Sequence, residues 1–366
     1  MEKKISPYEL LSSMFILPYG SAILFYLAPD AKQDAWFSML FYIIPAIILV
    51  LVHIKLFEFY PNDTLVTYMP KIFGKFLGSF LSLLYIIYFI YASTRVLRDF
   101  SSLIVSSSMP QTSVLFISSL IMIVVIYGVI VGIQTLSRAS EILFIIMMLG
   151  LLFAVLFLVN TKFVLNIDNL FPMFENGILF PIKKGWSLIT FPYGEFTAFT
   201  MLYKNLNDTS KIKKTVISAV ILEGVCLTII NILFITALGV NFASSSVFPL
   251  LETLRLIKIG GFLERLDIII IVTMVTGGFM KISFFMYFAV LGITDFFNIK
   301  STKLLSIIVG IIILFSSEII AKNFPQHLKI GLDVTVKYIH LPMQTIIPLL
   351  TLITAWFKNK SKNKTY

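Results

Sequence analysis

A glutamate and a lysine stand inside apolar stretches that are long enough to cross a membrane. Glu195 follows Phe191 to Gly194 in "FPYGE", and Lys281 stands in the middle of "GGFMKISFF". An ionised side chain in hydrocarbon is costly, so it pairs, faces a polar cavity or changes its protonation state. We predict that Lys281 pairs with Glu195, or with Glu223 of another apolar stretch, and that its amine takes the place of a bound cation.

The tripeptide Pro-Tyr-Gly occurs twice, in "LPYG" at 17–20 and in "FPYG" at 191–194. Proline removes a helix N–H group, and glycine permits an unwound backbone. Backbone groups freed in this way need polar partners inside a membrane. We therefore predict two interrupted helices that face one buried cavity, the arrangement that marks a substrate site in many transporters. A simple kink at each proline is the alternative.

The interrupted helices indicate which ligand such a cavity would bind. The second half of each helix is expected to begin near Gly20 or Glu195, where free N–H groups suit a carboxylate. The carbonyl groups near Leu17 and Phe191, together with ionised Glu195, suit an ammonium group. A zwitterionic amino acid satisfies both requirements. Aromatic walls and hydroxyl groups are expected from Tyr19 and Tyr193.

Other charged residues lie near the ends of apolar stretches. Arg95 and Asp99 are four residues apart in "YASTRVLRDF", so we predict a structural ion pair on one helix face, with ligand contact as the alternative. In "FLERLD", Glu264 and Asp267 are expected to cap a helix N-terminus. Arg265 beside them needs a partner, and we expect it to hold an outer loop.

These residues must be positioned by membrane-spanning helices. The chain has 366 residues, of which 58% are hydrophobic and 13% charged, and its mean hydropathy is +0.94. This composition is typical of an all-α polytopic membrane protein, since a span needs roughly 20 mostly apolar residues. Ten spans are predicted, at 6–27, 36–57, 76–106, 113–131, 140–160, 184–204, 213–239, 263–292, 303–321 and 337–357.

The ten spans divide into two halves of five within a single transmembrane domain, 1–366. Residues 1–160 form the first half and 184–357 the second. Because each half has an odd number of spans, the second half is inverted relative to the first. Lysine and arginine are enriched in the loops that are cytoplasmic if the N-terminus is inside. Both termini, including the basic tail 358–366, are therefore expected in the cytoplasm, where the basic residues contact the lipid bilayer.

Several functional classes are not supported. The net charge of +10 is explained by cytoplasmic loops, so no nucleic acid is expected as a partner. The histidines, His53, His327 and His340, are scattered, and the sequence has no metal-ligand spacing, phosphate-binding loop or nucleophile motif. We expect no enzyme activity, no cofactor and no metal.

Six stretches together resemble the spore-germination permease family, the B subunits of Ger-type nutrient germinant receptors. They are "ISPYELLSSMFI", "DAWFSML", "DNLFPMFENGILFPIKKGW", "FPYGE", "FLERLD" and "FMKISFF", and the resemblance runs nearly from end to end. The family belongs to the amino acid–polyamine–organocation superfamily. One departure is "LPYGS" in span one, where related members often have a small-residue turn without the preceding Pro-Tyr.

The resemblance implies the LeuT-like fold, with ten spans in a five-plus-five inverted repeat and spans one and six broken. It also implies a small germinant, often an amino acid, a membrane-anchored A subunit, a C-subunit lipoprotein, and the spore inner membrane as location. The resemblance carries the pocket onto Gly20 and Ser21, onto 191–195, and onto Lys281. Together with the analysis above, the predicted ligand-binding residues are Leu17, Tyr19, Gly20, Ser21, Phe191, Pro192, Tyr193, Gly194, Glu195 and Lys281.

The main hypothesis is thus a receptor subunit that binds a germinant between spans one, six and eight and triggers germination. One alternative is an amino-acid permease coupled to protons through Lys281 or Glu195. Another is an ion conduit gated by the ligand, with Glu195 on the ion path. The same site chemistry serves all three.

Overall fold

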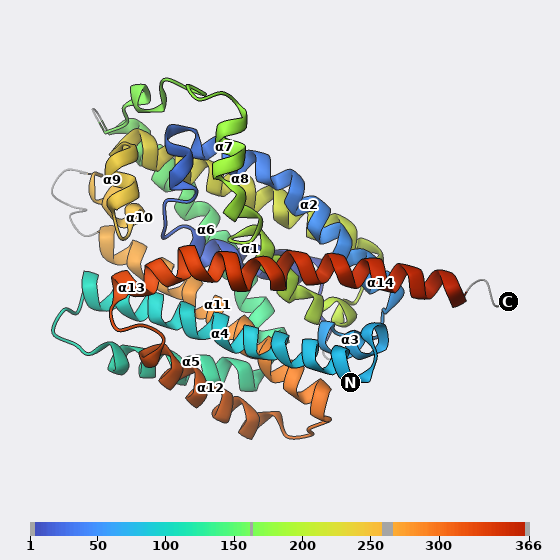
Figure 1. Ribbon diagram of the computed structural model, residues 1–366. Coiled ribbons are helices and arrows are strands. Elements are labelled where there is room, and N and C mark those ends of the chain that lie inside the picture. The colour runs from blue at the N-terminus through green and yellow to red at the C-terminus, as the bar shows by residue number, and fades with distance from the viewer. Residues whose placement is uncertain (1–3, 162–163, 258–265, 363–366) are drawn as a thin grey trace.

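The computed structural model describes residues 4–161, 164–257 and 266–362, which form a bundle of helices (Figure 1). The first half contains α1 (Pro7–Ala22), α2 (Ala35–Phe59), α3 (Leu65–Phe73), α4 (Lys75–Ser107), α5 (Val114–Val131) and α6 (Ile133–Asn160). The second half contains α7 (Leu179–Lys184), α8 (Ile212–Leu238), α9 (Val240–Ser245), α10 (Pro249–Arg255), α11 (Leu266–Phe297), α12 (Thr302–Ile319), α13 (Phe324–Lys329) and α14 (Ile347–Lys362).

Shorter helices connect or continue these elements. The 3₁₀ helix η1 (Pro29–Asp34) precedes α2, and the π-helical stretch η7 (Ile330–Ile346) joins α13 to α14. The remaining 3₁₀ helices are η2 (Ile167–Leu170), η3 (Trp186–Ile189), η4 (Tyr193–Met201), η5 (Tyr203–Asn205) and η6 (Thr209–Lys211).

Within the described residues, 8 helices are long and apolar enough to cross a membrane. Each coincides with one predicted span, and the two predicted spans without such a helix are 6–27 and 184–204. These are the two that contain Pro-Tyr-Gly. The eight helices are Pro29–Phe59, Lys75–Ser107, Val114–Val131, Ile133–Asn160, Thr209–Leu238, Ile271–Phe297, Thr302–Ile319 and Phe324–Lys360.

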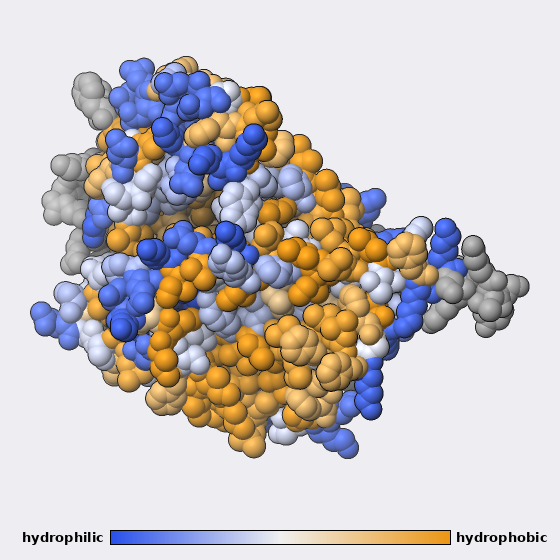
Figure 2. Space-filling view, in the orientation of Figure 1, coloured by the Kyte–Doolittle hydropathy of each residue, from blue (hydrophilic) through white to orange (hydrophobic). Residues whose placement is uncertain are grey.

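The surface has the pattern of a membrane protein. Figure 2 shows hydrophobic side chains over the middle of the visible face and hydrophilic ones gathered towards its two ends. Both chain termini lie towards one end of the bundle, while α7, α9 and α10 lie at the other (Figure 1). This arrangement agrees with an even number of membrane crossings.

The structure differs from the prediction at "LPYG". α1 is not interrupted there, and no second half-helix begins at Gly20: the helix runs through Pro18 to Ala22. A proline costs one helix hydrogen bond, and its fixed φ is compatible with the helix, so surrounding protein can accommodate it. A capping box between Ser6 and Glu9 fixes the start of the helix.

The interruption comes later, in segment 23–28, which is buried although it is not helical. Its backbone therefore needs partners from other elements. The side-chain amide of Asn231 on α8 is one such partner and donates to the carbonyl oxygen of Leu27 at 3.3 Å. The segment is also tied to η1 by its side chain, since the hydroxyl of Tyr26 donates to the carbonyl oxygen of Lys32 at 2.6 Å. Ala28 takes the left-handed conformation with φ 54°.

The sixth predicted span is interrupted where the sequence indicated. Between η3 and η4 the chain turns at Thr190 to Pro192, and the Phe191–Pro192 peptide is cis. The N–H group of Gly194 donates to the carbonyl oxygen of Thr190 at 2.8 Å, and the N–H group of Glu195 donates to that of Pro192 at 3.1 Å, the first 3₁₀-type bond of the next segment. A side chain at Gly194 would collide with Gln344 of η7. Glu195 is thereby held in the first turn of η4.

Helices from the two halves interleave around a shared core. α4 packs against α11, α2 against α8, α5 against α12, and α1 against η4. If the chain is divided into the two predicted halves of five spans, each of these contacts joins spans that have the same position in their halves. The large buried aromatic side chains, among them Phe89, Phe199 and Phe285, fill the centre.

Candidate functional site

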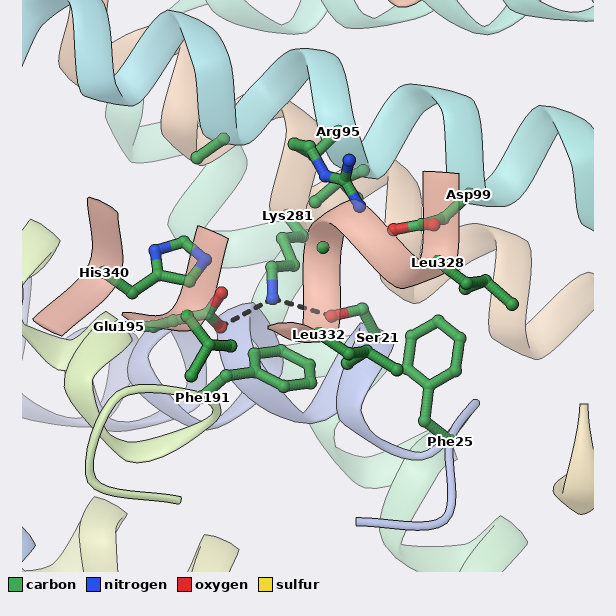
Figure 3. Close-up of a pocket in the computed structure, with 14 residues that line it drawn as sticks. Ser21, Phe25, Arg95, Asp99, Phe191, Glu195, Lys281, Leu328, Leu332 and His340 are labelled. Atoms are coloured by element: carbon green, nitrogen blue, oxygen red, sulfur yellow. Dashed lines mark hydrogen bonds and ion pairs between the residues drawn. The ribbon is translucent and has the colours of Figure 1, made fainter. Parts of the chain in front are cut away.

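A buried ion pair joins the two interrupted segments to α11. The ammonium of Lys281 donates to a carboxylate oxygen of Glu195 at 2.5 Å and to the hydroxyl of Ser21 at 2.7 Å. The Lys281 and Glu195 side chains are only 1% and 5% exposed. Figure 3 shows the ammonium between these two partners. Three separate elements, α1, η4 and α11, therefore meet at one charged atom.

Glycine residues let the helices come close enough for this contact. A Cβ atom at Gly20 would lie 2.8 Å from the carbonyl oxygen of Gly277, so the backbones of α1 and α11 touch there. A side chain at Gly278 would collide with Phe100 of α4. Lys281 follows Gly277 by one helical turn, and Ser21 follows Gly20. The close crossing thus sets Lys281 beside Ser21.

Two aromatic rings complete the surroundings of the ammonium. Its nitrogen lies 5.0 Å from the ring centroid of Phe191 and 5.9 Å from that of Phe285. Both distances are within the range of a cation–π interaction. Aromatic faces and a carboxylate around one ammonium form a site that suits a protonated amine in general.

The pair lines a cavity of about 60 Å³, with room for roughly four water molecules or a ligand group of that size. Of the predicted ligand-binding residues, Ser21, Phe191, Glu195 and Lys281 line it. The other lining residues are Phe25, Ala92, Arg95, Val96, Asp99, Leu328, Gly331, Leu332, Val336 and His340.

The prediction that Arg95 pairs with Asp99 is wrong, because both side chains bond to His327 instead. The carboxylate of Asp99 accepts from the ring nitrogen Nε2 of His327 at 2.9 Å, and Arg95 donates to the carbonyl oxygen of His327 at 2.6 Å. The reason is that α13 lies over this face of α4, so both side chains reach it instead of each other. Gly331 leaves space for the guanidinium, with which a side chain there would collide.

Sequence reasoning missed the contribution of the segment before α14. His327 was only one of three scattered histidines, and His340 lines the cavity, with its Nδ1 2.8 Å from the hydroxyl of Tyr88. His327 lies in the α-helix α13 and His340 in the π-helical η7, so no single α-helical register relates them and could have indicated a site. Arg98 also finds an unpredicted partner, Glu318, at 3.1 Å.

Other predicted residues lie away from this cavity. Leu17 belongs to the hydrophobic core, and Tyr193 donates its hydroxyl to the carbonyl oxygen of Met39 at 2.8 Å. Tyr19 lines a second, apolar cavity of about 320 Å³, which also touches α6, α8, α10 and α11. Because α1 stays helical through "LPYG", Tyr19 and Ser21 project from different sides of it.

The remaining predicted charged residues are Glu264, Arg265, Asp267 and Glu223. Glu264 and Arg265 lie outside the described residues, and Asp267 is in the first turn of α11. Glu223 of α8 is fully buried, but Lys281 contacts Glu195 instead. Among the described residues, no group of three or more histidine, cysteine, aspartate or glutamate side chains could hold a metal ion.

The chain matches the protein family described as "Spore germination protein" over residues 4–325. Spore germination protein KB of Bacillus subtilis (strain 168) is 35% identical over 367 residues, which cover 100% of this chain and 98% of that protein. Spore germination protein YndE of the same organism is 26% identical, with 90% of each chain covered. Spore germination protein XB of Bacillus anthracis is 23% identical, with 79% of this chain and 78% of that protein covered.

Two solved structures share the fold. The crystal structure of MhsT in complex with L-phenylalanine matches with a TM-score of 0.66 at 16% identity, covering 97% of this chain and 89% of that one. Mhp1, a nucleobase-cation-symport-1 family transporter in a closed conformation with bromovinylhydantoin bound, matches with a TM-score of 0.60 at 12% identity, covering 91% and 75%. At these identities the likeness concerns the fold alone.

Proposed function

Because the chain belongs to the spore germination permease family, we propose that it is the membrane subunit of a nutrient germinant receptor and binds a small germinant, an amino acid. It is a multi-pass membrane protein whose family and fold are those of receptors and transporters. The proposed pocket lies between α1, the interrupted segment at 190–195, and α11. MhsT, which shares the fold, was solved with an amino acid bound.

The observation that carries this proposal is the buried contact of Lys281 with Glu195 and Ser21. Charged residues in a membrane are expensive and mark ligand or ion sites by default. The contact connects segment 190–195 and the end of α1, both of which have irregular backbone beside it. Irregular backbone at membrane depth is tolerated where it lines a cavity.

The cavity offers a partner for each end of an amino acid. The ammonium group would take the carboxylate of Glu195 and the face of Phe191, in competition with Lys281. The carboxylate of the ligand would accept hydrogen bonds from Arg95, whose Nη1 is buried and has no hydrogen-bond partner among the described residues. Arg95 replaces the half-helix N-terminus that the sequence had suggested near Gly20.

Triggering would follow from that competition. If the ligand's ammonium takes Glu195, Lys281 must find another partner, and the contact between α1 and α11 through Ser21 changes. A ligand shifts a conformational equilibrium only through contacts that differ between the two states. The exchange of partners at Lys281 is such a difference, and α11 carries it through the bundle to α4, against which it packs.

We further propose the complete arrangement in the membrane. It has ten spans in a five-plus-five inverted repeat, cytoplasmic termini, and a place in the spore inner membrane beside A-type and C-type subunits. The contacts of α2 with α8, α4 with α11, and α5 with α12 support the repeat, because equivalent elements of an inverted repeat meet around its pseudo-two-fold axis. Both termini at one end of the bundle support an even number of spans (Figure 1).

The test is the germination response of spores in which this chain is the only B subunit. The proteinogenic amino acids are screened first, and the response to an active one is then compared between variants. Glu195→Gln and Gly20→Leu are expected to abolish the response while the protein stays in the membrane. Glu58→Gln, on an exposed pair with Lys55, should leave it unchanged. A normal dose–response in Glu195→Gln would place the pocket elsewhere.

A second candidate, a proton-coupled amino-acid permease, is favoured by the fold shared with MhsT and Mhp1. Uptake into vesicles that contain this chain alone separates the two. Proton-dependent accumulation of a labelled amino acid would support the permease. A ligand-triggered cation current without uptake would instead support the ion conduit.

A further inference from the structure

A second buried acid lies within electrostatic range of the Lys281–Glu195 pair, outside the residues that line their cavity, and has no role in the function proposed above. Glu223, in the middle of α8, is 0% exposed. Neither of its carboxylate oxygens has a hydrogen-bond partner among the described residues. A buried polar group without a partner is costly, and a buried isolated charge far more so. The neutral, protonated carboxyl is the form that this environment tolerates.

The surroundings of Glu223 offer no second positive charge in the described part of the chain. α2 faces this turn of α8 with the apolar Ile43, which lies against Gly224 together with the hydroxyl of Tyr193. That hydroxyl is already committed to a backbone carbonyl. The ionisable side chains close enough to interact electrostatically with Glu223 are Tyr19 of α1, Tyr193 and Glu195 of η4, Cys226 of α8 itself, and Lys281 of α11.

The charges of this group can be counted. Lys281 carries one positive charge, which the carboxylate of Glu195 balances at 2.5 Å. If Glu223 were also ionised, one negative charge would remain unbalanced on a fully buried side chain. With a proton on Glu223 the three side chains together are neutral, and after loss of that proton they can balance the charge of one further cation.

We propose that Glu223 holds a proton in this conformation and releases it when a further positive charge enters beside Glu195, so that the site exchanges one proton for one cation. The cation is either the ammonium group of a ligand or a monovalent metal ion. Before the exchange the three side chains sum to zero. Afterwards the carboxylates of Glu195 and Glu223 balance the charges of Lys281 and the bound cation, and the proton is released to solvent.

This inference deepens the proposed function and rests on it, since it assigns ion coupling to the same pocket. It predicts that cation binding tightens about tenfold for each unit of pH increase while one proton is released per cation. It also predicts that removal of the Glu223 carboxyl abolishes this dependence, because glutamine has no proton to exchange.

The proton itself is tested first, without any ligand. Infrared difference spectra of the full-length protein in lipid nanodiscs should show the carbonyl band of a protonated carboxyl at neutral pH, shifted in heavy water. The band should be absent from Glu223→Gln and retained in Glu252→Gln, whose glutamate is paired with Arg255 at the surface. A spectrum without the band, or a band that persists in Glu223→Gln, overturns the assignment.

Proton release is then measured with a pH-sensitive dye in weak buffer. Methylammonium chloride represents the ammonium group of a ligand, and potassium and sodium chloride represent metal ions. A release of one proton by methylammonium alone identifies a ligand ammonium as the exchanging cation, and release by potassium or sodium identifies a metal ion. Glu223→Gln should release none in either arm.

Binding without proton release, or equal release from Glu223→Gln, overturns the exchange, as does the absence of release with all three salts. These failures differ from a failure of the proposed function. A normal germination response in Glu195→Gln refutes the pocket but leaves the infrared band of Glu223 in place. A missing infrared band refutes the proton on Glu223 but leaves the pocket standing.

Discussion

Replacement of Lys281 with methionine is expected to destabilise the protein strongly, although the two side chains are similar in size. Methionine fills a similar volume but cannot donate to Glu195 or Ser21, which Lys281 now contacts at 2.5 Å and 2.7 Å. The main cost is the carboxylate of Glu195, which is 5% exposed and would lose its counter-charge. Breaking a buried pair by removing one partner typically costs about 3–5 kcal/mol.

The double variant Lys281→Met/Glu195→Gln separates the charge effect from packing. It removes both charges and keeps both shapes, so no uncompensated charge remains. Replacement of a buried pair by apolar groups of similar volume is often close to neutral, and a neutral glutamine amide costs far less to bury than an unpaired carboxylate. We therefore expect the double variant to recover most of the free energy of unfolding that Lys281→Met loses.

The free energy of unfolding can be followed by titration with sodium dodecyl sulfate in mixed micelles. Lys55→Met is the matched control, because Lys55 pairs with Glu58 at 2.7 Å but both side chains are half exposed. An exposed pair contributes about 0–1 kcal/mol. If Lys281→Met and Lys55→Met lose the same free energy, or if the double variant loses the sum of its single variants, the buried pair is not the coupled unit described here.

Two further substitutions test the backbone arrangement around the pocket. Gly20→Ala forces a methyl group to 2.8 Å from the carbonyl oxygen of Gly277 and should cost about 1–3 kcal/mol, whereas Gly150→Ala, with nothing within 4 Å, should be neutral or slightly stabilising in the same unfolding titration. Equal effects at the two glycines would show that α1 and α11 do not touch. Asn231→Ala leaves the buried carbonyl of Leu27 without its donor and should cost about 1–3 kcal/mol, with faster hydrogen exchange in segment 23–28. Unchanged exchange there would show that the carbonyl has another partner.

The sequence predicted those parts of the site that follow from residue type and position along the chain. A charged residue in an apolar stretch must find a partner wherever it lies, so burial predicted that Lys281 pairs with Glu195 or Glu223, and the structure shows Glu195. Long apolar runs likewise predicted their helices closely, as with 36–57 and the observed α2 at Ala35–Phe59. The break at 190–192 also matched, because proline and glycine act locally.

The remaining features depend on contacts between distant segments. The unwound segment "ILFYLA" at 23–28 contains neither glycine nor proline, and it is sustained by Asn231 from another helix. Gly20 allows the close approach of α11, where a larger residue would collide with the backbone. No local sequence pattern distinguishes this role of a glycine from the interruption of a helix. His327 meets Asp99 only because α13 folds over α4. These outcomes are set by tertiary packing, which propensity and periodicity do not report.

The most direct test of the central claim is amino-acid binding to the purified full-length protein in lipid nanodiscs, measured by titration calorimetry. The account predicts that an amino acid active in the germination screen binds the unaltered protein. Its affinity should fall at least about tenfold in Glu195→Gln, the loss expected from one charge-assisted hydrogen bond. Glu58→Gln should bind as the unaltered protein does. Undiminished affinity in Glu195→Gln would contradict the assignment of the germinant to the buried Lys281–Glu195 pair.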